Sequence, residues 1–227
     1  MPVYNEEETV SDSVRSWMKE LESLDINFEV HAYNDGSADN TLSVLNSLTD
    51  IYPNLVVHNK PNTGHGPTIL AAYRQHSDKD WIFQTDSDNE MDPSAFKHLW
   101  FKKDDYDFLL GARSGRDQAI SRAIVSLFSR FIVRVFYGRG IYDVNSPYRL
   151  MKTSSLKDIY YKIPDNTFAP NVIISGVVNA RKLEFLEIPV MHQNRQSGTV
   201  SINKFKLIKA ALKSFWQTSV FVFSHHL

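Results

Sequence analysis

The sequence contains no cysteine among its 227 residues. Disulfides, thiolate nucleophiles and thiolate metal sites are therefore excluded, and any metal ligands must be oxygen or imidazole nitrogen. An excess of charge of one sign is also missing, because 25 basic residues stand against 26 acidic ones. Nothing draws the whole chain to nucleic acid, so we expect no nucleic-acid partner, and any charged ligand must meet a local patch.

Long hydrophobic runs are absent as well. No stretch reaches the ~20 apolar residues that span a bilayer, and no apolar signal segment precedes the motif at 2–7. This abrupt start predicts an opening strand that is shortened at its amino end. A hydrophobic content of 42% still suffices for one well-packed domain.

The apolar residues of the first half change repeatedly between helix-like and strand-like spacing. Strands are predicted at 28–33, 55–58, 81–85 and 106–110, and helices near 8–24, 39–49, 66–76 and 93–101. This alternation predicts an α/β fold with a Rossmann-like, mostly parallel central sheet and helices on both faces. Ligands of such sheets bind beyond the carboxyl ends of the strands, so the loops there are the candidate sites.

Three acids at alternate positions follow the predicted strand 81–85, namely Asp86, Asp88 and Glu90. An extended chain places them on one side, where they repel one another unless a cation lies among them. Carboxylate oxygens suit Mg²⁺ or Mn²⁺, and either ion can bridge a diphosphate. The segment predicts a metal site for a phosphate-bearing substrate. The alternative is a solvated acidic loop that caps the helix after Pro93.

Two further loops contain residues that are typical of tight turns. The loop that starts at Asn34-Asp35-Gly36-Ser37 is either a turn with a helix cap or a contact to a base or ribose. The loop Asn62-Thr63-Gly64-His65-Gly66 is typical of a backbone that approaches a ligand closely, although a single Gly-x-Gly is a weak signal. We interpret His65 as a loop residue rather than a metal ligand.

In their order and spacing, these loops and the segment 2–7 resemble the donor half of family 2 glycosyltransferases with the GT-A fold. The resemblance spans essentially the whole chain. It implies a nucleotide-diphosphate sugar and Mg²⁺ or Mn²⁺ held by Asp86, Asp88 and Glu90. The family commonly has two acids where this chain has Asn34-Asp35, which leaves the base preference open. The donor-binding residues implied are Pro2, Tyr4, Glu6, Asn34, Asp35 and Asp86.

The second half resembles the polyprenyl-phosphate branch of that family, which includes dolichyl-phosphate mannosyltransferases and bacterial lipid-phosphate glucosyltransferases. The matching segments are 88–90, 111–113, 145–149 and 195–198. This resemblance implies that Asp88, Arg113 and Arg195 are catalytic. It also implies that Arg122 and Arg149 contact the phosphate of the acceptor.

The expected reaction is an inverting transfer of the sugar to a dolichyl or undecaprenyl phosphate. A lipid phosphate is already an anion, whereas an acceptor hydroxyl needs a positioned base, and the segment 168–172 holds no acid where relatives acting on hydroxyls usually have a Glu-Asp pair. Asp165 keeps transfer to a sugar hydroxyl open as an alternative. A third possibility is a nucleotide-sugar-binding domain without turnover, because Glu90 and His65 replace a glutamine and a lysine frequent in the family.

Two basic segments with apolar faces lie in the second half. The segment 119–137 carries Arg122, Arg130 and Arg134, and the tail carries four lysines ahead of Phe215-Trp216. Such helices suit an anionic membrane surface, or else complete the core. We predict a single GT-A catalytic domain at 1–202, with a nucleotide-sugar half at about 1–113 and an acceptor half at about 114–202. A basic amphipathic helix at 203–227 is expected to hold the protein peripherally at the cytoplasmic face of the membrane.

Overall fold

The computed structural model describes residues 1–114, 140–192 and 204–225, together with residues 131, 134, 136 and 138. Arg122, Arg195 and most of the predicted helix at 119–137 lie outside these ranges. Residues 131, 134 and 136 are helical, and the side chains of Phe131 and Arg134 are exposed.

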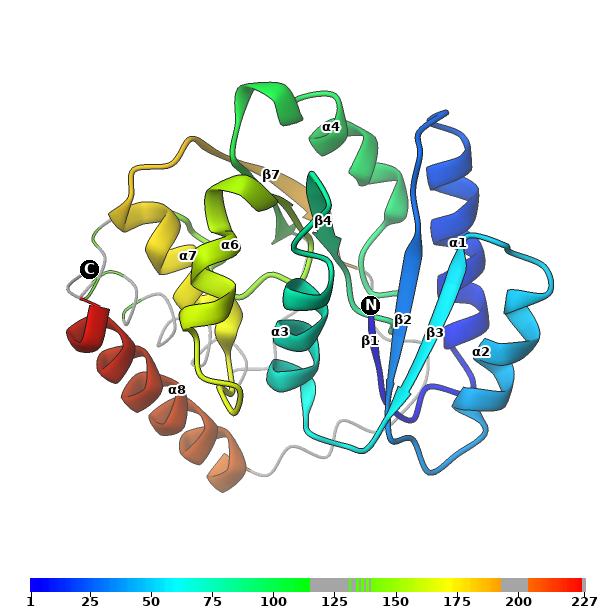
Figure 1. Ribbon diagram of the computed structural model, residues 1–227, viewed down its shortest axis with the longest axis horizontal. Coiled ribbons are helices and arrows are strands. Elements are labelled where there is room, and N and C mark those ends of the chain that lie inside the picture. The colour runs from blue at the N-terminus through cyan, green and yellow to red at the C-terminus, as the bar shows by residue number, and fades with distance from the viewer. Residues whose placement is uncertain are drawn as a thin grey trace.

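The first half alternates strands and helices as the sequence predicts (Figure 1). Its elements are β1 (Pro2–Val3), α1 (Val10–Glu22), β2 (Val30–Asp35), α2 (Thr41–Thr49), β3 (Leu55–Lys60), α3 (His65–Gln75), β4 (Trp81–Gln84), the 3₁₀ turn η1 (Pro93–Ala95), α4 (Phe96–Trp100), the 3₁₀ turn η2 (Lys103–Asp105) and β5 (Phe108–Ser114). The second half contributes β6 (Arg149–Lys152), α6 (Thr153–Lys162), α7 (Pro170–Ala180), β7 (Phe185–Met191) and α8 (Lys204–His225).

The described strands form two sheets. One has the order β1-β2-β3 and is parallel, and the other has the order β4-β6-β5-β7. Strand β6 is antiparallel to both neighbours, whereas β5 and β7 are parallel. The start of β6 therefore lies at the same edge as the carboxyl ends of β4, β5 and β7. Residues from four separate stretches of sequence meet at that edge.

Helices cover both faces of the first sheet, with α1 and α2 on one side and α3 on the other (Figure 1). Helix α1 forms because its apolar residues recur on one face, which is buried. Trp17 on that face lies 5.1 Å from Phe83 and 5.6 Å from Tyr148 between ring centroids. Each such buried aromatic contributes about 1.5–3 kcal/mol. Beside the short β1, a cavity of about 720 Å³ lies between β2 and β4.

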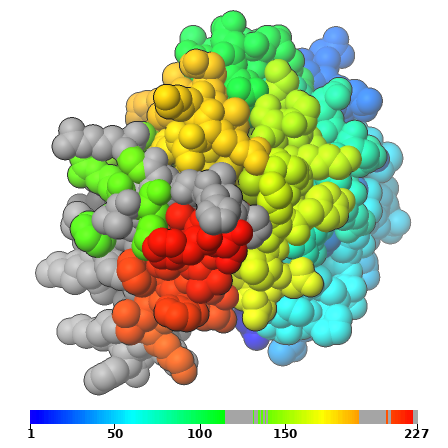
Figure 2. All heavy atoms as spheres, turned by 60° about the vertical axis from the view of Figure 1, so that its left-hand side comes forward, coloured from blue at the N-terminus to red at the C-terminus, as the bar shows by residue number. Residues whose placement is uncertain are grey.

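Helix α8 packs against α7 and lies on the molecular surface, in orange and red in Figure 2. Ser214, Thr218, Phe221 and Val222 are buried on its inner face. Its outer face exposes four large apolar side chains, Leu212, Trp216, Val220 and Phe223. Within the described ranges, no helix combines the length and the apolar character that crossing a bilayer requires.

Candidate active site

The loops that follow β1 and β2 are joined by hydrogen bonds. The backbone N–H of Asn5 donates to Ser37 Oγ at 3.0 Å, and that of Glu6 donates to Thr41 Oγ1 at 2.9 Å. In return, the N–H of Ala38 donates to Asn5 Oδ1 at 2.8 Å. These bonds hold the predicted donor-binding segments 2–7 and 34–41 side by side.

Asn34 is buried at the end of β2, and its amide is engaged on both sides. Its Nδ2 donates to Asn59 Oδ1 at 2.8 Å, and its Oδ1 accepts from Ser37 Oγ at 2.5 Å. Gly36 follows with φ of +68°, and a Cβ there would lie 2.6 Å from the backbone nitrogen of Asn62. Only glycine fits this turn, which brings the loops after β2 and β3 together.

Asp35 anchors the loop after β3. Its carboxylate accepts from the backbone N–H groups of Thr63 at 2.9 Å and Gly64 at 2.8 Å, and pairs with Lys60. Burial acts to raise the pKa of Asp35, but these bonds outweigh it and lower the pKa below its usual value. Asp35 is therefore an ionised anchor at neutral pH.

The other predicted donor residues lie near these loops. Pro2 is buried in β1, and Tyr4 beyond it is 50% exposed. Glu6 Oε2 accepts from Thr9 Oγ1 at 2.7 Å in the turn before α1. Contacts of these residues with a nucleoside stay a prediction.

The acidic loop after β4 is not the extended segment that the sequence predicts. Strand β4 ends at Gln84, and Asn89 adopts a positive φ of 56°. The chain turns there because the N–H of Glu90 donates to Asp88 Oδ1 at 3.2 Å. Asp86, Asp88 and Glu90 nevertheless all line one small cavity, because the turn folds the loop over the sheet edge.

Electrostatics distinguish Asp88 from Asp86. Burial, together with the charges of Asp86 and Glu90, raises the pKa of Asp88 to about 6. Asp86 lies 3.1 Å from His65 Nε2 at the start of α3. Burial acts to raise the pKa of Asp86, but His65 and Arg113 lower it below its usual value. The loop thus concentrates negative charge that a cation would relieve.

Arg113, at the end of β5, lines the same cavity as the acids. Its Nε and Nη2 donate to the two carboxylate oxygens of Asp143 at 2.8 and 2.7 Å. Asp143 is held in turn, because its backbone N–H donates to Glu187 Oε1 at 2.9 Å. The guanidinium is therefore fixed in one orientation beside the acidic loop. The sequence predicted Arg113 as a site residue and gave no indication of Asp143.

His192 was also missed by sequence reasoning. It follows β7, and its Nε2 lies 2.8 Å from Glu90 Oε2. Its Nδ1 is buried without a hydrogen-bond partner in the described part of the chain. No sequence signal links the two residues, because their contact depends on the pairing of Met91 with His192 across the sheet edge.

Arg149 does not fit the predicted contact with an acceptor phosphate. The side chain is fully buried at the start of β6, and its guanidinium donates to the carbonyl oxygens of Ser146, Val144 and Asn171. Because β6 lies between β4 and β5, the arginine binds backbone in the interior. Its role is to satisfy these carbonyl groups, and the prediction for Arg149 is wrong.

Asp165, the candidate base for a hydroxyl acceptor, lies away from the acidic loop. Its side chain is 90% exposed and pairs with Arg74. Arg74 is nine residues along α3 from His65, a separation of about 13 Å at the helical rise. The base required by the hydroxyl alternative is therefore not at this position.

The residues around the acidic loop fit a hard divalent cation. Three carboxylates and the unpartnered Nδ1 of His192 meet at one cavity, and oxygen donors of this type bind Mg²⁺ or Mn²⁺. The three carboxylates do not lie as close together as the ligands of a bound ion. Among the described residues, three ligand atoms lie within 4.8 Å of one another only in a group of three histidines elsewhere in the fold.

The strand order, the linked donor loops and the acids beside a fixed arginine define an α/β protein with the GT-A fold. A family model described as glycosyl transferase family 2 matches residues 1–160, and the chain belongs to this family.

One similar curated protein is an undecaprenyl-phosphate 4-deoxy-4-formamido-L-arabinose transferase of Sodalis glossinidius (strain morsitans). It is 26% identical over 211 residues, which cover 92% of this chain and 63% of that protein. The chain thus spans less than two thirds of this relative's length.

Solved structures share the fold at low identity. A mannosyl-3-phosphoglycerate synthase from Rubrobacter xylanophilus gives a TM-score of 0.72 at 13% identity, over 99% of this chain and 73% of that one. A glucosyl-3-phosphoglycerate synthase from Mycobacterium tuberculosis, solved with Mn²⁺, UDP and phosphoglyceric acid, gives 0.68 at 13%, over 96% and 76%. The S. aureus protein TarS gives 0.59 at 22%, over 92% and 38%.

Proposed function

We propose that the chain transfers a sugar from a nucleotide-diphosphate sugar to a polyprenyl phosphate, with inversion at the anomeric carbon. Membership of glycosyl transferase family 2 and similarity to an undecaprenyl-phosphate transferase support this reaction. The observation that carries the proposal is the cavity where Asp86, Asp88 and Glu90 face the fixed guanidinium of Arg113. The carboxylates of this cavity can bind a cation, and the guanidinium beside them can bind a phosphate.

The proposed roles of the residues are supported by the lining of the cavity and, for Arg122 and Arg195, by the family resemblance alone. Asp86, Asp88 and Glu90 are the ligands proposed for Mg²⁺ or Mn²⁺, and a mycobacterial structural neighbour was solved with Mn²⁺ and UDP. A bound ion supplies neutralisation of the charge on the leaving diphosphate. Arg113, held by Asp143, orients a phosphate oxygen, and Arg195 and Arg122 are proposed as further phosphate contacts.

The donor nucleoside is proposed to lie over the joined loops after β1, β2 and β3. Tyr4 offers an exposed ring there, and Asp35 keeps the loop at 61–64 in place. A single in-line displacement on the anomeric carbon inverts its configuration. We further propose that residues 1–202 form the catalytic domain, whose nucleotide-sugar half ends at about residue 113.

Attachment at the cytoplasmic face of the membrane is proposed through α8. Leu212, Trp216, Val220 and Phe223 are spaced by three or four residues and form one exposed apolar stripe. Lys209 and Lys213 are exposed on the same helix. An apolar stripe flanked by lysines suits the interface of an anionic bilayer.

The acceptor is tested by incubation with labelled nucleotide sugars, Mn²⁺ and either polyprenyl phosphate or the matching polyprenol, followed by lipid extraction. We expect labelled lipid from the phosphate alone. Equal labelling of the polyprenol would favour a hydroxyl acceptor. Binding of nucleotide sugars without transfer from any of them would indicate a nucleotide-sugar-binding domain without catalytic activity.

The membrane surface is tested by sedimentation with anionic vesicles. We expect the double substitution of Trp216 and Phe223 by serine to reduce the bound fraction several-fold without changing transfer to a short soluble acceptor. The control is the replacement of Phe101 by serine, because this side chain is also exposed but lies at the end of α4, outside α8. A bound fraction unchanged by the α8 variant would exclude the stripe as the attachment surface.

A further inference from the structure

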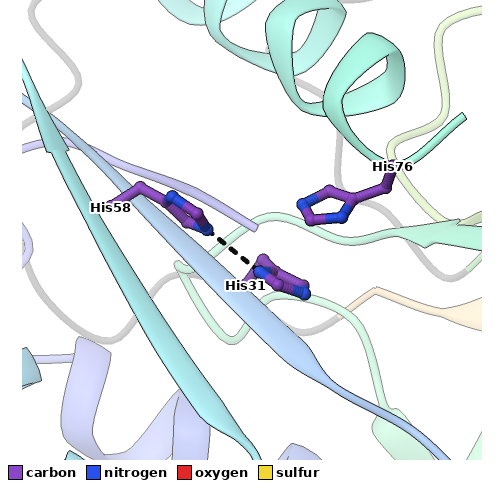
Figure 3. A group of neighbouring side chains, drawn as sticks. All are labelled: His31, His58 and His76. Atoms are coloured by element: carbon purple, nitrogen blue, oxygen red, sulfur yellow. Dashed lines mark hydrogen bonds between the residues drawn. The ribbon is translucent and has the colours of Figure 1, made fainter.

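Three histidines gather at a place that the proposed reaction does not use. His31 belongs to β2, His58 to β3, and His76 follows the last turn of α3. Figure 3 shows the three rings turned toward one another. One ring nitrogen from each lies within 4.8 Å of the others, and His31 Nδ1 is 3.0 Å from His58 Nε2.

This cluster lies apart from the candidate active site. His31 is near the amino end of β2, whereas Asn34 and Asp35 end that strand. Likewise, His76 follows the carboxyl end of α3, whereas His65 begins the helix. None of the three histidines lines the small cavity of the acidic loop, which follows a strand of the other sheet.

The fold itself brings the three rings together. Tyr33 pairs with His58 across β2 and β3, and His31 shares the face of Tyr33 because side chains repeat every two residues. The ring of Tyr33 stacks on His58 at 4.2 Å, and its hydroxyl lies 2.9 Å from His76 Nε2. Tyr33 thus positions two of the three imidazoles.

The protonation of His31 follows from its neighbour Glu29. A carboxylate only accepts, so the 3.4 Å contact with Glu29 Oε2 places the proton on His31 Nε2 and leaves a lone pair on Nδ1. Glu29 is held by Lys79 at 2.9 Å. A carboxylate behind an imidazole in this way orients metal-binding histidines and raises their basicity.

The imidazoles are also uncharged. Burial above all lowers the pKa of His31 to about 4, so this ring is neutral at pH 7. Burial likewise lowers the pKa of His58 and of His76. Neutral rings supply lone pairs without first losing a proton.

We propose that His31, His58 and His76 form a Zn²⁺ site, with a fourth position open to water. Imidazole nitrogens suit zinc, and three protein ligands with one open position are a common zinc arrangement. Bonds of about 2.0–2.1 Å place tetrahedral ligand nitrogens roughly 3.3 Å apart, close to the 3.0 Å between His31 and His58.

Zinc binding replaces the His58–His31 hydrogen bond. Without zinc, the N–H at His58 Nε2 donates a hydrogen bond to His31 Nδ1. Zinc binding therefore requires the proton of His58 to leave Nε2 and a proton to be taken up at His58 Nδ1, by exchange with solvent. His31 and His76 also line the cavity of about 720 Å³ between β2 and β4, which gives an ion a route to the site. The acidic loop, with oxygen donors, prefers harder ions.

The purified chain is titrated with Zn²⁺ in the presence of excess Mg²⁺, and binding is measured by calorimetry. In a second experiment Co²⁺ replaces zinc, and its visible absorption spectrum is recorded. We expect one zinc per chain and the intense absorption of tetrahedral cobalt. Alanine at His31, His58 or His76 should each weaken zinc binding by more than about tenfold. His98→Ala, on an exposed position of α4, is the matched control and should leave binding unchanged.

A milder variant covers the case in which an alanine variant does not fold. Glu29→Gln keeps the size of an exposed side chain, so we expect normal melting without zinc and about tenfold weaker zinc binding. Zinc affinity unchanged in Glu29→Gln and in the histidine variants would overturn the proposal. Loss of binding in Asp88→Ala instead would also overturn it, by moving the ion to the acidic loop.

Discussion

Four loops follow the carboxyl ends of strands β1 to β4, and they differ in how their polar groups are satisfied. The first three are joined by hydrogen bonds, and the carboxylate of Asp35 is met by Lys60 and two backbone N–H groups. In the last, Asp88 is crowded by Asp86 and Glu90, and its pKa rises to about 6. The loops after β1, β2 and β3 are already stabilised by their own hydrogen bonds, whereas the acidic loop would gain stability from a bound cation.

The largest effect is expected from Asp88→Ala on the crowded side. Transfer should fall by about 10²-fold or more, because the loop loses one of the ligands proposed for the ion that would neutralise the leaving group. The fold should hold, since the change also relieves repulsion. Turnover and thermal melting are measured together. Near wild-type activity at saturating Mn²⁺ would contradict the metal assignment.

In the hydrogen-bonded loops, Asp35→Ala should act on stability. Removal of the carboxylate leaves the backbone N–H groups of Thr63 and Gly64 without their acceptor and Lys60 without its counter-ion, at a cost of about 2–3 kcal/mol. Chemical denaturation measures the loss. Asp107→Ala, at a partly exposed acid outside these loops, is the control. If Asp35→Ala were as stable as the wild type, the loops after β1, β2 and β3 would not depend on the hydrogen bonds of Asp35, and the contrast with the acidic loop would be wrong.

The pH dependence separates the two carboxylates. The folded pKa of Asp88, about 6, exceeds the reference value of 3.8, so its ionised form opposes folding at pH 7 and this penalty disappears as pH falls from 7 to 4. The pKa of Asp35 is lowered, so its contribution persists above 3.8 and is lost below it. We expect Asp88→Asn to be about 1–3 kcal/mol more stable than the wild type at pH 7, with the difference vanishing near pH 4. Denaturation curves at both pH values decide this, and a difference independent of pH would contradict it.

The smallest effect is expected from Ser37→Ala. Its hydroxyl accepts from Asn5 N–H at 3.0 Å and donates to Asn34 Oδ1 at 2.5 Å. The bond from Asn5 is exposed and Ser37 itself is half-buried, although the change also leaves the buried Asn34 Oδ1 without its Ser37 donor. Stability should therefore fall by about 1 kcal/mol. Donor affinity, measured by calorimetry with the nucleotide, should fall in parallel if this loop holds the nucleoside. Unchanged affinity would limit Ser37 to a structural role.

The sequence alone determined the alternation of elements and the identity of the loops. Strands β2 to β5 and helices α1 to α4 lie close to their predicted ranges, because hydrophobic periodicity and turn residues are local properties. Asp86, Asp88 and Arg113 were predicted as site residues for the same reason, since each lies at or just beyond the end of a recognisable strand, and their roles stay a prediction.

Only the tertiary structure decided what depends on strand order. Arg149 is interior because β6 runs between β4 and β5, and a residue's burial is set by the neighbours of its strand rather than by its own pattern. His192 meets Glu90 across about a hundred residues, and Asp143 reaches Arg113 from a loop thirty residues away. The three histidines meet because β2 and β3 pair in one register while α3 ends over them. Such contacts arise from packing between distant segments, which no periodicity within one segment encodes.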